Sequence, residues 1–158
     1  MTTALQARQA VRSRVEADAN RPLDGGGVQI PLSWQNESYT LPDIPAPFVH
    51  IEFDNDGPNG RGPTAFGGGQ GQNLYRNRAS VVAYVFVPKD EGLDEADSIA
   101  EQVATLFRSY RDSTISCSSA HTYPGGNGAD IKPPGLDSEV GNYFYAMAEA
   151  SLTFDLVG

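Results

Sequence analysis

The sequence predicts one α+β domain, with a mostly antiparallel sheet and two helices on one face of it. The chain has 158 residues, the usual length of a single domain with a single core. Segments in which apolar residues alternate, as in strands, are interleaved with two segments in which they recur at helical spacing. The elements follow the order α-β-β-loop-β-α-β-β without an internal repeat, so residues 1–158 are treated as one domain.

Two segments have the pattern of amphipathic helices. Thr2 or Thr3 can cap a helix over residues 3–19, and its apolar stripe Ala4, Ala7, Val11 and Val15 has spacings of three or four residues. Residues 94–111 have acidic side chains in the first turn and arginines at the end, an arrangement that the helix dipole favours. The apolar stripe of this second segment consists of Ala96, Ile99, Ala100, Val103, Leu106, Phe107 and Tyr110.

Five segments have the alternation or composition of strands: 28–34, 48–53, 78–87, 114–122 and 143–156. Pro31 cannot donate a ladder hydrogen bond, so the first of these strands is predicted at a sheet edge. Residues 78–87 are apolar on both faces and are predicted to form the central strand. The last strand has Phe144 and a row of alanines on one face and a polar face that includes Tyr143 and Tyr145.

Residues 54–73 form a long glycine-rich loop in this prediction. The segment holds seven glycines and has no helix or strand pattern. Loops of this length inside a compact domain are uncommon and are usually functional or disordered. We expect an arm that becomes ordered against a partner, with Arg61 and Phe66 as its anchors.

Charge and cysteine content exclude several classes of protein. Twenty acidic residues against eleven basic ones give a net charge of -9, whereas sequence-independent binding to DNA or anionic lipid requires a basic surface. One cysteine cannot form an internal disulfide. The N-terminus lacks an apolar signal segment, and no apolar run is long enough to cross a bilayer. We therefore expect a soluble protein made in a cytoplasm, without a membrane partner.

The residues that could support catalysis are few and separated. His50 and His121 each lie inside a strand pattern, with no acidic or cysteine neighbour at metal-ligand spacing. In a regular strand Cys117 and His121 would point to the same side but stand roughly 13 Å apart, too far for direct contact. We predict no catalytic residue, no cofactor and no metal site, and hence no enzyme.

A contact surface is the function that the residues support. Tyr75, Arg76 and Arg78 enter the central strand with the two arginines on one side, and Tyr143 and Tyr145 lie on the polar face of the last strand. Tyrosine and arginine are enriched in protein interfaces because they give contact area and forked hydrogen bonding. Solvated side chains at strand ends would fit the same pattern.

An ordered set of motifs over most of the chain resembles the phage tail terminator-like proteins of siphophages and gene transfer agents. The set begins with the short N-terminal helix and ends with the strand after Tyr143. Between them come, in order, LSWQNE (32–37), which precedes a proline-rich stretch, and FVHIEF (48–53). The segment from GGQ (68–70) to Tyr75-Arg76, VFVP (85–88) and the helix Ala96 to Phe107 follow.

The resemblance implies a structural virion protein without catalytic residues. Such a protein forms a ring, typically of six copies, on the head-proximal end of the tail tube. It stops polymerisation of the tube protein and offers a docking surface to the head connector. DNA passes through the bore without specific binding, which the acidic balance of this chain suits. The expected location is the head-tail junction of a particle assembled in the bacterial host cytoplasm.

Two alternatives stay open at this point. A head-completion or head-tail joining ring protein would also be small, α+β and ring-forming. A small hydrolase or a carbohydrate-binding module that uses the 54–73 loop belongs to a different class. No acid, base and nucleophile converge in the sequence, and Trp34 falls on an apolar strand face instead of a sugar-binding surface.

Overall fold

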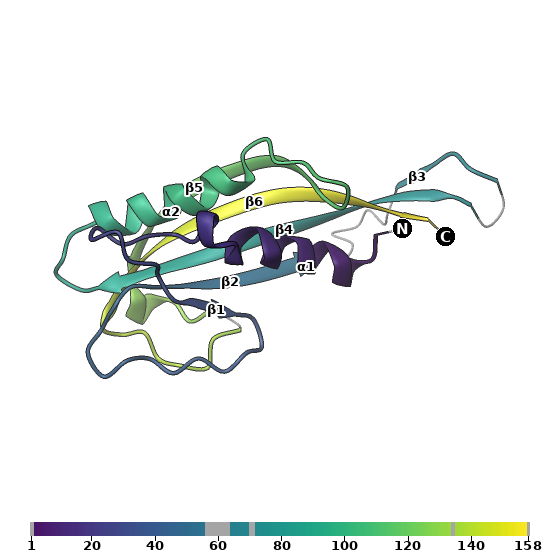
Figure 1. Cartoon of the computed structure of the whole chain (residues 1–158). Coiled ribbons are helices and arrows are strands. Elements are labelled where there is room, and N and C mark those ends of the chain that lie inside the picture. Colours follow the sequence, from purple (N-terminus) through teal and green to yellow (C-terminus); the bar gives the residue numbers. More distant parts are fainter. Residues whose placement is uncertain (1, 56–63, 70–71, 134, 158) are drawn as a thin grey trace.

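The strands form one mixed sheet in the order β1–β2–β4–β6–β5, and β3 pairs with β4 off this path (Figure 1). The structure, a computed structural model, describes residues 2–55, 64–69, 72–133 and 135–157. The elements are α1 (Ala4–Glu16), η1 (Asp18–Asn20), β1 (Leu32–Trp34), β2 (Phe48–Asn55), β3 (Thr64–Phe66), β4 (Leu74–Pro88), α2 (Asp94–Phe107), β5 (Ser116–Asn127), η2 (Gly128–Asp130) and β6 (Tyr143–Val157). β1 is parallel to β2 and the other described pairs are antiparallel, so the fold is α+β as predicted.

Helix α1 begins at a capping box. The Thr3 hydroxyl accepts a hydrogen bond from the Gln6 backbone amide at 3.2 Å, and the Gln6 side chain accepts one from the Thr3 amide at 2.8 Å. The helix ends three residues earlier than expected because Ala17 turns into an extended conformation, and η1 follows. Its buried stripe is the predicted one, Ala7, Val11 and Val15.

Helix α2 places its predicted stripe in the core. Ala96, Ile99 and Val103 are buried, and acidic residues occupy the first turn. The helix ends at Phe107 instead of residue 111 because Arg108 is extended and Ser109 has a φ of 55°. The chain then turns toward β5, where the Tyr110 carbonyl accepts a hydrogen bond from the Cys117 amide at 2.8 Å.

The long strands β4 and β6 pair along fifteen residues each and form the middle of the sheet. β4 lies between β2 and β6, which confirms the central position predicted for residues 78–87. β1 is an edge strand, as Pro31 suggested, but it is shorter than the predicted 28–34. Val28 is exposed because the chain first makes a turn, in which the Asp24 amide bonds to the Val28 carbonyl.

The prediction that 54–73 lacks secondary structure is wrong in part. β3 pairs with β4, with Thr64 opposite Arg76, and β2 pairs with the same edge of β4 up to Asn55 opposite Ala79. A turn then leads from β3 into β4, with the Leu74 amide bonded to the Gly67 carbonyl. Gly68 has a φ of +123°, and an added Cβ would lie 2.2 Å from the Gln72 carbonyl oxygen, so this turn requires glycine. Residues 56–63 and 70–71 lie outside the described residues.

Strand β5 contains two irregularities that sequence alternation could not show. Its register against β6 shifts between Cys117 and Ser119 and again between Tyr123 and Gly126. The extra residue of the first shift reverses the faces. Cys117 and Ala120 are therefore buried toward the core while His121 is exposed, so the expectation that Cys117 and His121 share a side is wrong.

The larger core lies between the sheet and both helices. α1 contributes Val11, α2 contributes Phe107, and the sheet contributes alternating residues such as Val85 and Ala148. Both helices therefore cover the same face, as predicted (Figure 1). No helix in the described ranges is long and apolar enough to cross a membrane.

A second, smaller core lies on the opposite face, at the end where β4 finishes. The Phe48 ring stacks on Tyr39 at 4.9 Å and on Phe86 at 4.8 Å between ring centroids. Loop residues cover this end, among them Leu136 and Val140. No α-helix described in the structure covers this second face.

Candidate functional site

The predicted arginines lie where β3, β4 and β6 extend beyond the rest of the sheet (Figure 1). Arg76 and Arg78 are exposed on the same side of β4, as predicted. Arg76 is paired within the chain: its Nε and Nη2 donate to the two carboxylate oxygens of Asp155 on β6, at 2.8 and 2.9 Å. This pairing raises the pKa of Arg76 and lowers the pKa of Asp155. Arg76 is thus fixed by its own chain, which sequence spacing across two distant strands could not show.

The other predicted contact residues of this region differ in their placement. Arg78 lies opposite Thr153 and makes no ion pair with any residue that the structure describes. Tyr75 lies on the other side of β4 and is half-buried. Phe66 pairs with Leu74 at the end of β3, and Arg61 lies outside the described residues.

The two tyrosines of β6 belong to the second core, which corrects their expected place on a polar face. Tyr143 is 2% exposed and its ring meets that of Phe48 edge-on at 5.3 Å. Tyr145 is half-buried, 6.3 Å from Phe86 between ring centroids. The alternation placed both on the correct side of the strand but could not show that loops cover this end of the face. Tyr143 is therefore not available at the surface of this chain.

A buried polar cluster joins β1 and β2 beside the second core. The Ser33 hydroxyl lies 2.9 Å from His50 Nδ1, and His50 Nε2 lies 3.3 Å from Glu52 Oε1. The Glu52 carboxylate also accepts a hydrogen bond from the Gly135 amide at 3.0 Å. The sequence prediction overlooked Glu52 as a neighbour of His50, although residues two apart share a face of a strand.

This cluster has the residue types of a hydrolase triad but not the access that a hydrolase needs. His50 is 0% exposed and Ser33 is 3% exposed, so a substrate cannot reach the hydroxyl. Burial raises the pKa of the Glu52 carboxyl, but the neighbouring His50 and the hydrogen bond from the Gly135 amide outweigh it and lower that pKa overall. The arrangement can hold the loop around Gly135 against the sheet, because Glu52 is a fixed, charged acceptor.

Cys117 is the other reactive residue type in the chain, and its surroundings do not activate it. Burial, and to a smaller extent the nearby Asp112, raise the pKa of its thiol to about 11. A thiol with a raised pKa holds little of the nucleophilic thiolate at neutral pH. Within the described residues no group of three or more His, Cys, Asp or Glu side chains could hold a metal ion.

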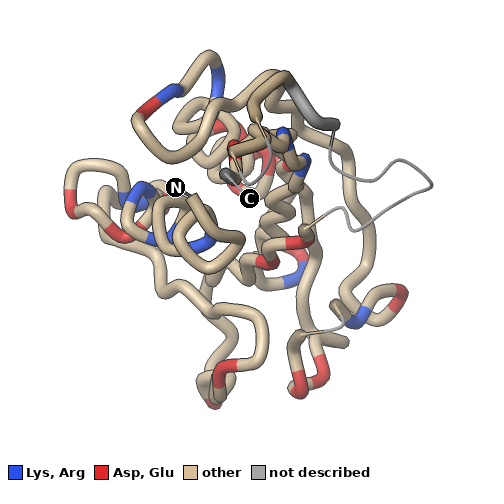
Figure 2. The backbone as a smooth tube through the Cα atoms, turned by 90° about the vertical axis from the view of Figure 1, so that its right-hand side faces the viewer, with Lys and Arg blue, Asp and Glu red and all other residues tan. Residues whose placement is uncertain are grey.

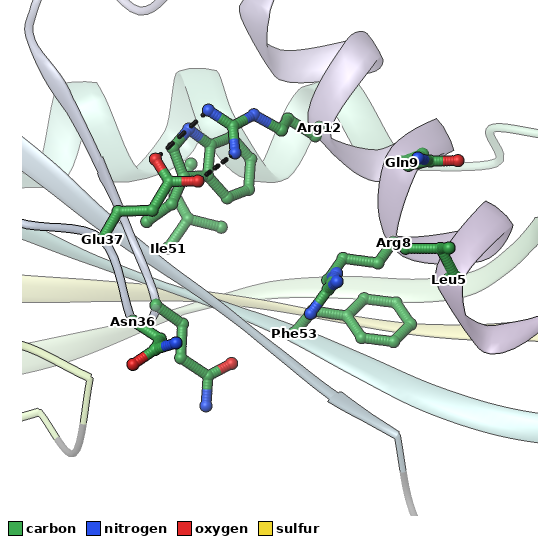
Figure 3. Close-up of a pocket in the computed structure, with 10 residues that line it drawn as sticks. Leu5, Arg8, Gln9, Arg12, Asn36, Glu37, Ile51 and Phe53 are labelled. Atoms are coloured by element: carbon green, nitrogen blue, oxygen red, sulfur yellow. Dashed lines mark hydrogen bonds and ion pairs between the residues drawn. The ribbon is translucent and has the colours of Figure 1, made fainter.

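A groove of about 360 Å³ lies between α1 and the edge formed by β1 and β2 (Figure 3). Arg12 crosses one end of it, with its guanidinium 5.1 Å from the centre of the Trp34 ring. Both Glu16, at 2.8 Å, and Glu37 bind Arg12, and these carboxylates raise its pKa. The Arg12 charge is therefore satisfied within the chain.

The rest of the groove is rich in side-chain donors that have no partner in the described part of the chain. Arg8 reaches from α1 toward the side of Phe53, and no ion pair is seen for it among the described residues (Figure 3). Amide side chains lie along the lining, and Leu5 and Phe53 supply an apolar wall. Figure 2 shows blue basic positions along α1 near the N-terminus of an otherwise acidic chain. The groove was not predicted, because its parts come from three separate segments.

Comparisons with known proteins support the fold alone. No family model and no curated protein matches the chain. Solved structures do match it: one, whose name states no activity, aligns over 95% of this chain and 94% of its own, with a TM-score of 0.55 and 13% sequence identity. The chain therefore shares an end-to-end architecture with a solved protein, at an identity too low to transfer a function.

Proposed function

We propose that this chain is a tail terminator-like structural protein. It forms a ring on the head-proximal end of a phage-like tail tube, stops polymerisation of the tube and offers a docking surface to the head connector. The observation that carries the proposal is the ordered motif set, most of whose members fall on successive helices and strands of the fold. LSWQNE is β1 and the turn after it, FVHIEF lies in β2, and VFVP closes β4. The resemblance thus follows the helices and strands of the fold as well as the segments that join them.

The shape of the sheet supports an assembly role. β3, β4 and β6 extend past the end of β2 and the start of β5 and form a narrow projection (Figure 1). One face of the sheet has no α-helix in the described structure, and the groove beside α1 contains donors without a partner among the described residues. These are surfaces through which one small domain can contact several neighbours at once.

The charge of the chain suits a protein through which DNA passes. Proteins bind DNA without sequence preference when their basic side chains displace the counterions of the phosphates. Chains of net charge -9 have no excess of basic side chains for this, so a ring of them does not hold the duplex. The partners proposed are further copies of this chain, the tail tube protein and the head connector. The particle is a virion or gene transfer agent assembled in the bacterial cytoplasm.

The test is to produce the tail tube protein with and without this chain and to image the tubes. A terminator gives tubes of limited length with extra density at one end, and mass measurement of the capped tubes gives several copies per tube. Uncontrolled tube growth in the presence of the folded chain overturns the proposal. Co-purification with filled heads and absence from tails would assign the chain to head completion instead.

A further inference from the structure

We propose that the groove beside α1 binds the turn between β4 and α2 of a neighbouring copy of this chain. The turn, residues 89–94, places Leu93 between Glu91 and Asp94. Leu93 is 53% exposed, although it is a large apolar residue. This contact rests on the proposed ring and names the surfaces through which the ring closes.

The dipole of α2 does not account for the composition of this turn. Carboxylates in the first turn of a helix, such as Asp94 and Asp97, are stabilised by the helix N-terminus. Asp90 and Glu91 precede the helix and gain little from it, yet both are exposed and acidic. Asp90 also has a positive φ of 69°, in the left-handed region that Asp adopts more readily than most residues. The exposed carboxylates of Asp90, Glu91 and Asp94 outnumber the half-buried Lys89, so the turn is acidic overall and presents one apolar side chain to the outside.

The groove has the complementary set of groups. Arg8 is its cation without an ion pair among the described residues, and the amides of Gln9, Gln35 and Asn36 are further donors in the lining. Leu5, which is 53% exposed, and Phe53 form the apolar part. The carboxylates of the turn can accept hydrogen bonds from these donors, while its leucine packs on the apolar wall. Complementary potentials of this kind select the partner and fix its register.

The two surfaces cannot meet within one chain. In Figure 1 the turn after β4 lies at the left end of the molecule, whereas the first turns of α1, which line the groove, lie toward the right. The contact is therefore between different patches of two copies. Such head-to-tail contacts generate closed rings when the rotation between copies closes.

Engineered cysteines test the contact directly on tubes capped by the full chain. Chains with Leu5→Cys are mixed with chains with Leu93→Cys, and mild oxidation gives a disulfide-linked dimer. Neither variant alone cross-links, because a head-to-tail contact brings residue 5 to residue 93 and not to itself. The native Cys117 is buried and stays unreactive. Ile44→Cys mixed with Leu93→Cys is the control, since Ile44 is exposed but lies outside the groove lining.

Charge reversal gives a second, independent readout. Arg8→Glu and Glu91→Arg each place like charges across the contact and raise the protein concentration needed for half-maximal capping about tenfold or more. The two changes combined restore capping, while thermal melting of each variant matches the parent. Capped tubes that show neither the 5–93 cross-link nor this rescue overturn the contact and leave the ring standing. Absence of any ring on the tubes overturns the proposed function and this contact together.

Discussion

The two faces of the sheet differ in how they are covered. One face accounts for the folding stability, and the other is more available to partners. One face is covered by α1 and α2 over an alternating set of small and branched apolar residues such as Val81 and Ala150. The other is covered only at one end, by loops that pack on Phe48 and Phe86. A helix buries a continuous apolar stripe. A loop covers only the part of the sheet against which a few contacts hold it. We infer that the helix face determines the folding stability and that the loop-covered face can change with less cost.

The anchors of the loop cover are individual polar bonds. Glu52 accepts from the Gly135 amide at 3.0 Å, and the Ser138 hydroxyl donates to the Tyr39 carbonyl at 3.0 Å. Gly135 also lies so close to Gln35 that an added Cβ would be 2.8 Å from its Cγ. The cover therefore depends on a small number of specific contacts in segments far apart in sequence. The following predictions test this contrast, from the largest expected effect to the smallest.

The largest effect is expected on the helix face. Phe107→Ala removes a ring that is 0% exposed at the end of α2, and such a truncation costs about 4–5 kcal/mol in the free energy of unfolding. The cavity lies among strands and a helix that cannot collapse into it. Chemical denaturation measures the loss. Leu93→Ala, at an exposed position just before the start of α2, is the control that stays near the parent. A loss equal to that of the control would mean that the helix face does not dominate stability.

A smaller loss is expected from the second core. Phe48→Ala also removes a fully buried ring, but loops can move toward the gap, so the cost falls at the lower end of the range, about 3 kcal/mol. Hydrogen exchange should increase first in residues 35–47 and 128–142, while α2 stays protected. Uniform loss of protection in both regions would show that the two faces unfold as one unit.

The next effect is pH-dependent and concerns Glu52. The folded pKa of its carboxyl lies below 4.5, so its stabilising contribution is complete above that value and is lost as the pH falls through the folded pKa. Glu52→Gln should cost about 1–3 kcal/mol near neutral pH, because a charged acceptor of a buried hydrogen bond is replaced by a neutral one. Stability measured over acidic pH should fall less steeply in the variant than in the parent. Asp112 and Asp155, whose pKa values are also lowered, are present in both proteins, so their contributions cancel in the comparison.

The helix face is the part of the fold that the sequence could predict. Alternation over β4 and β6 and the helical stripe of α2 are local patterns, and each specifies which side chains are buried. Where local geometry departs from the pattern, the prediction was wrong: the bulge after Cys117 turned His121 outward, and Ser109 ended α2 early. A single extra residue in a strand reverses the phase of a period-two pattern, so a prediction that assumes regular alternation places the later side chains on the wrong face.

The second face could not be predicted, because its contacts join distant segments. Tyr39, Phe86 and Tyr143 meet in one core, although no periodicity relates them. The same holds for the pair Arg76–Asp155 and for the groove beside α1. The sequence therefore identified Arg76, Arg78 and the tyrosines as candidates by residue type but could not show which of them the fold itself would use.

The smallest effect on stability, and the sharpest test of availability, is expected at Arg78. Its side chain is exposed on the projecting part of β4, and substitutions at such positions usually change stability by less than about 0.5 kcal/mol. Unlike Arg76, which Asp155 holds, Arg78 has no ion pair among the described residues, so it is the arginine of the two that can serve a partner. Arg78→Glu should therefore leave the melting temperature near that of the parent and yet reduce capping of tail tubes. Lys132→Glu makes the same charge change at another exposed position and should leave capping unchanged. If both variants cap tubes as well as the parent does, Arg78 belongs to free surface. If both lose capping to the same degree, net charge controls assembly, and not a contact at the projection.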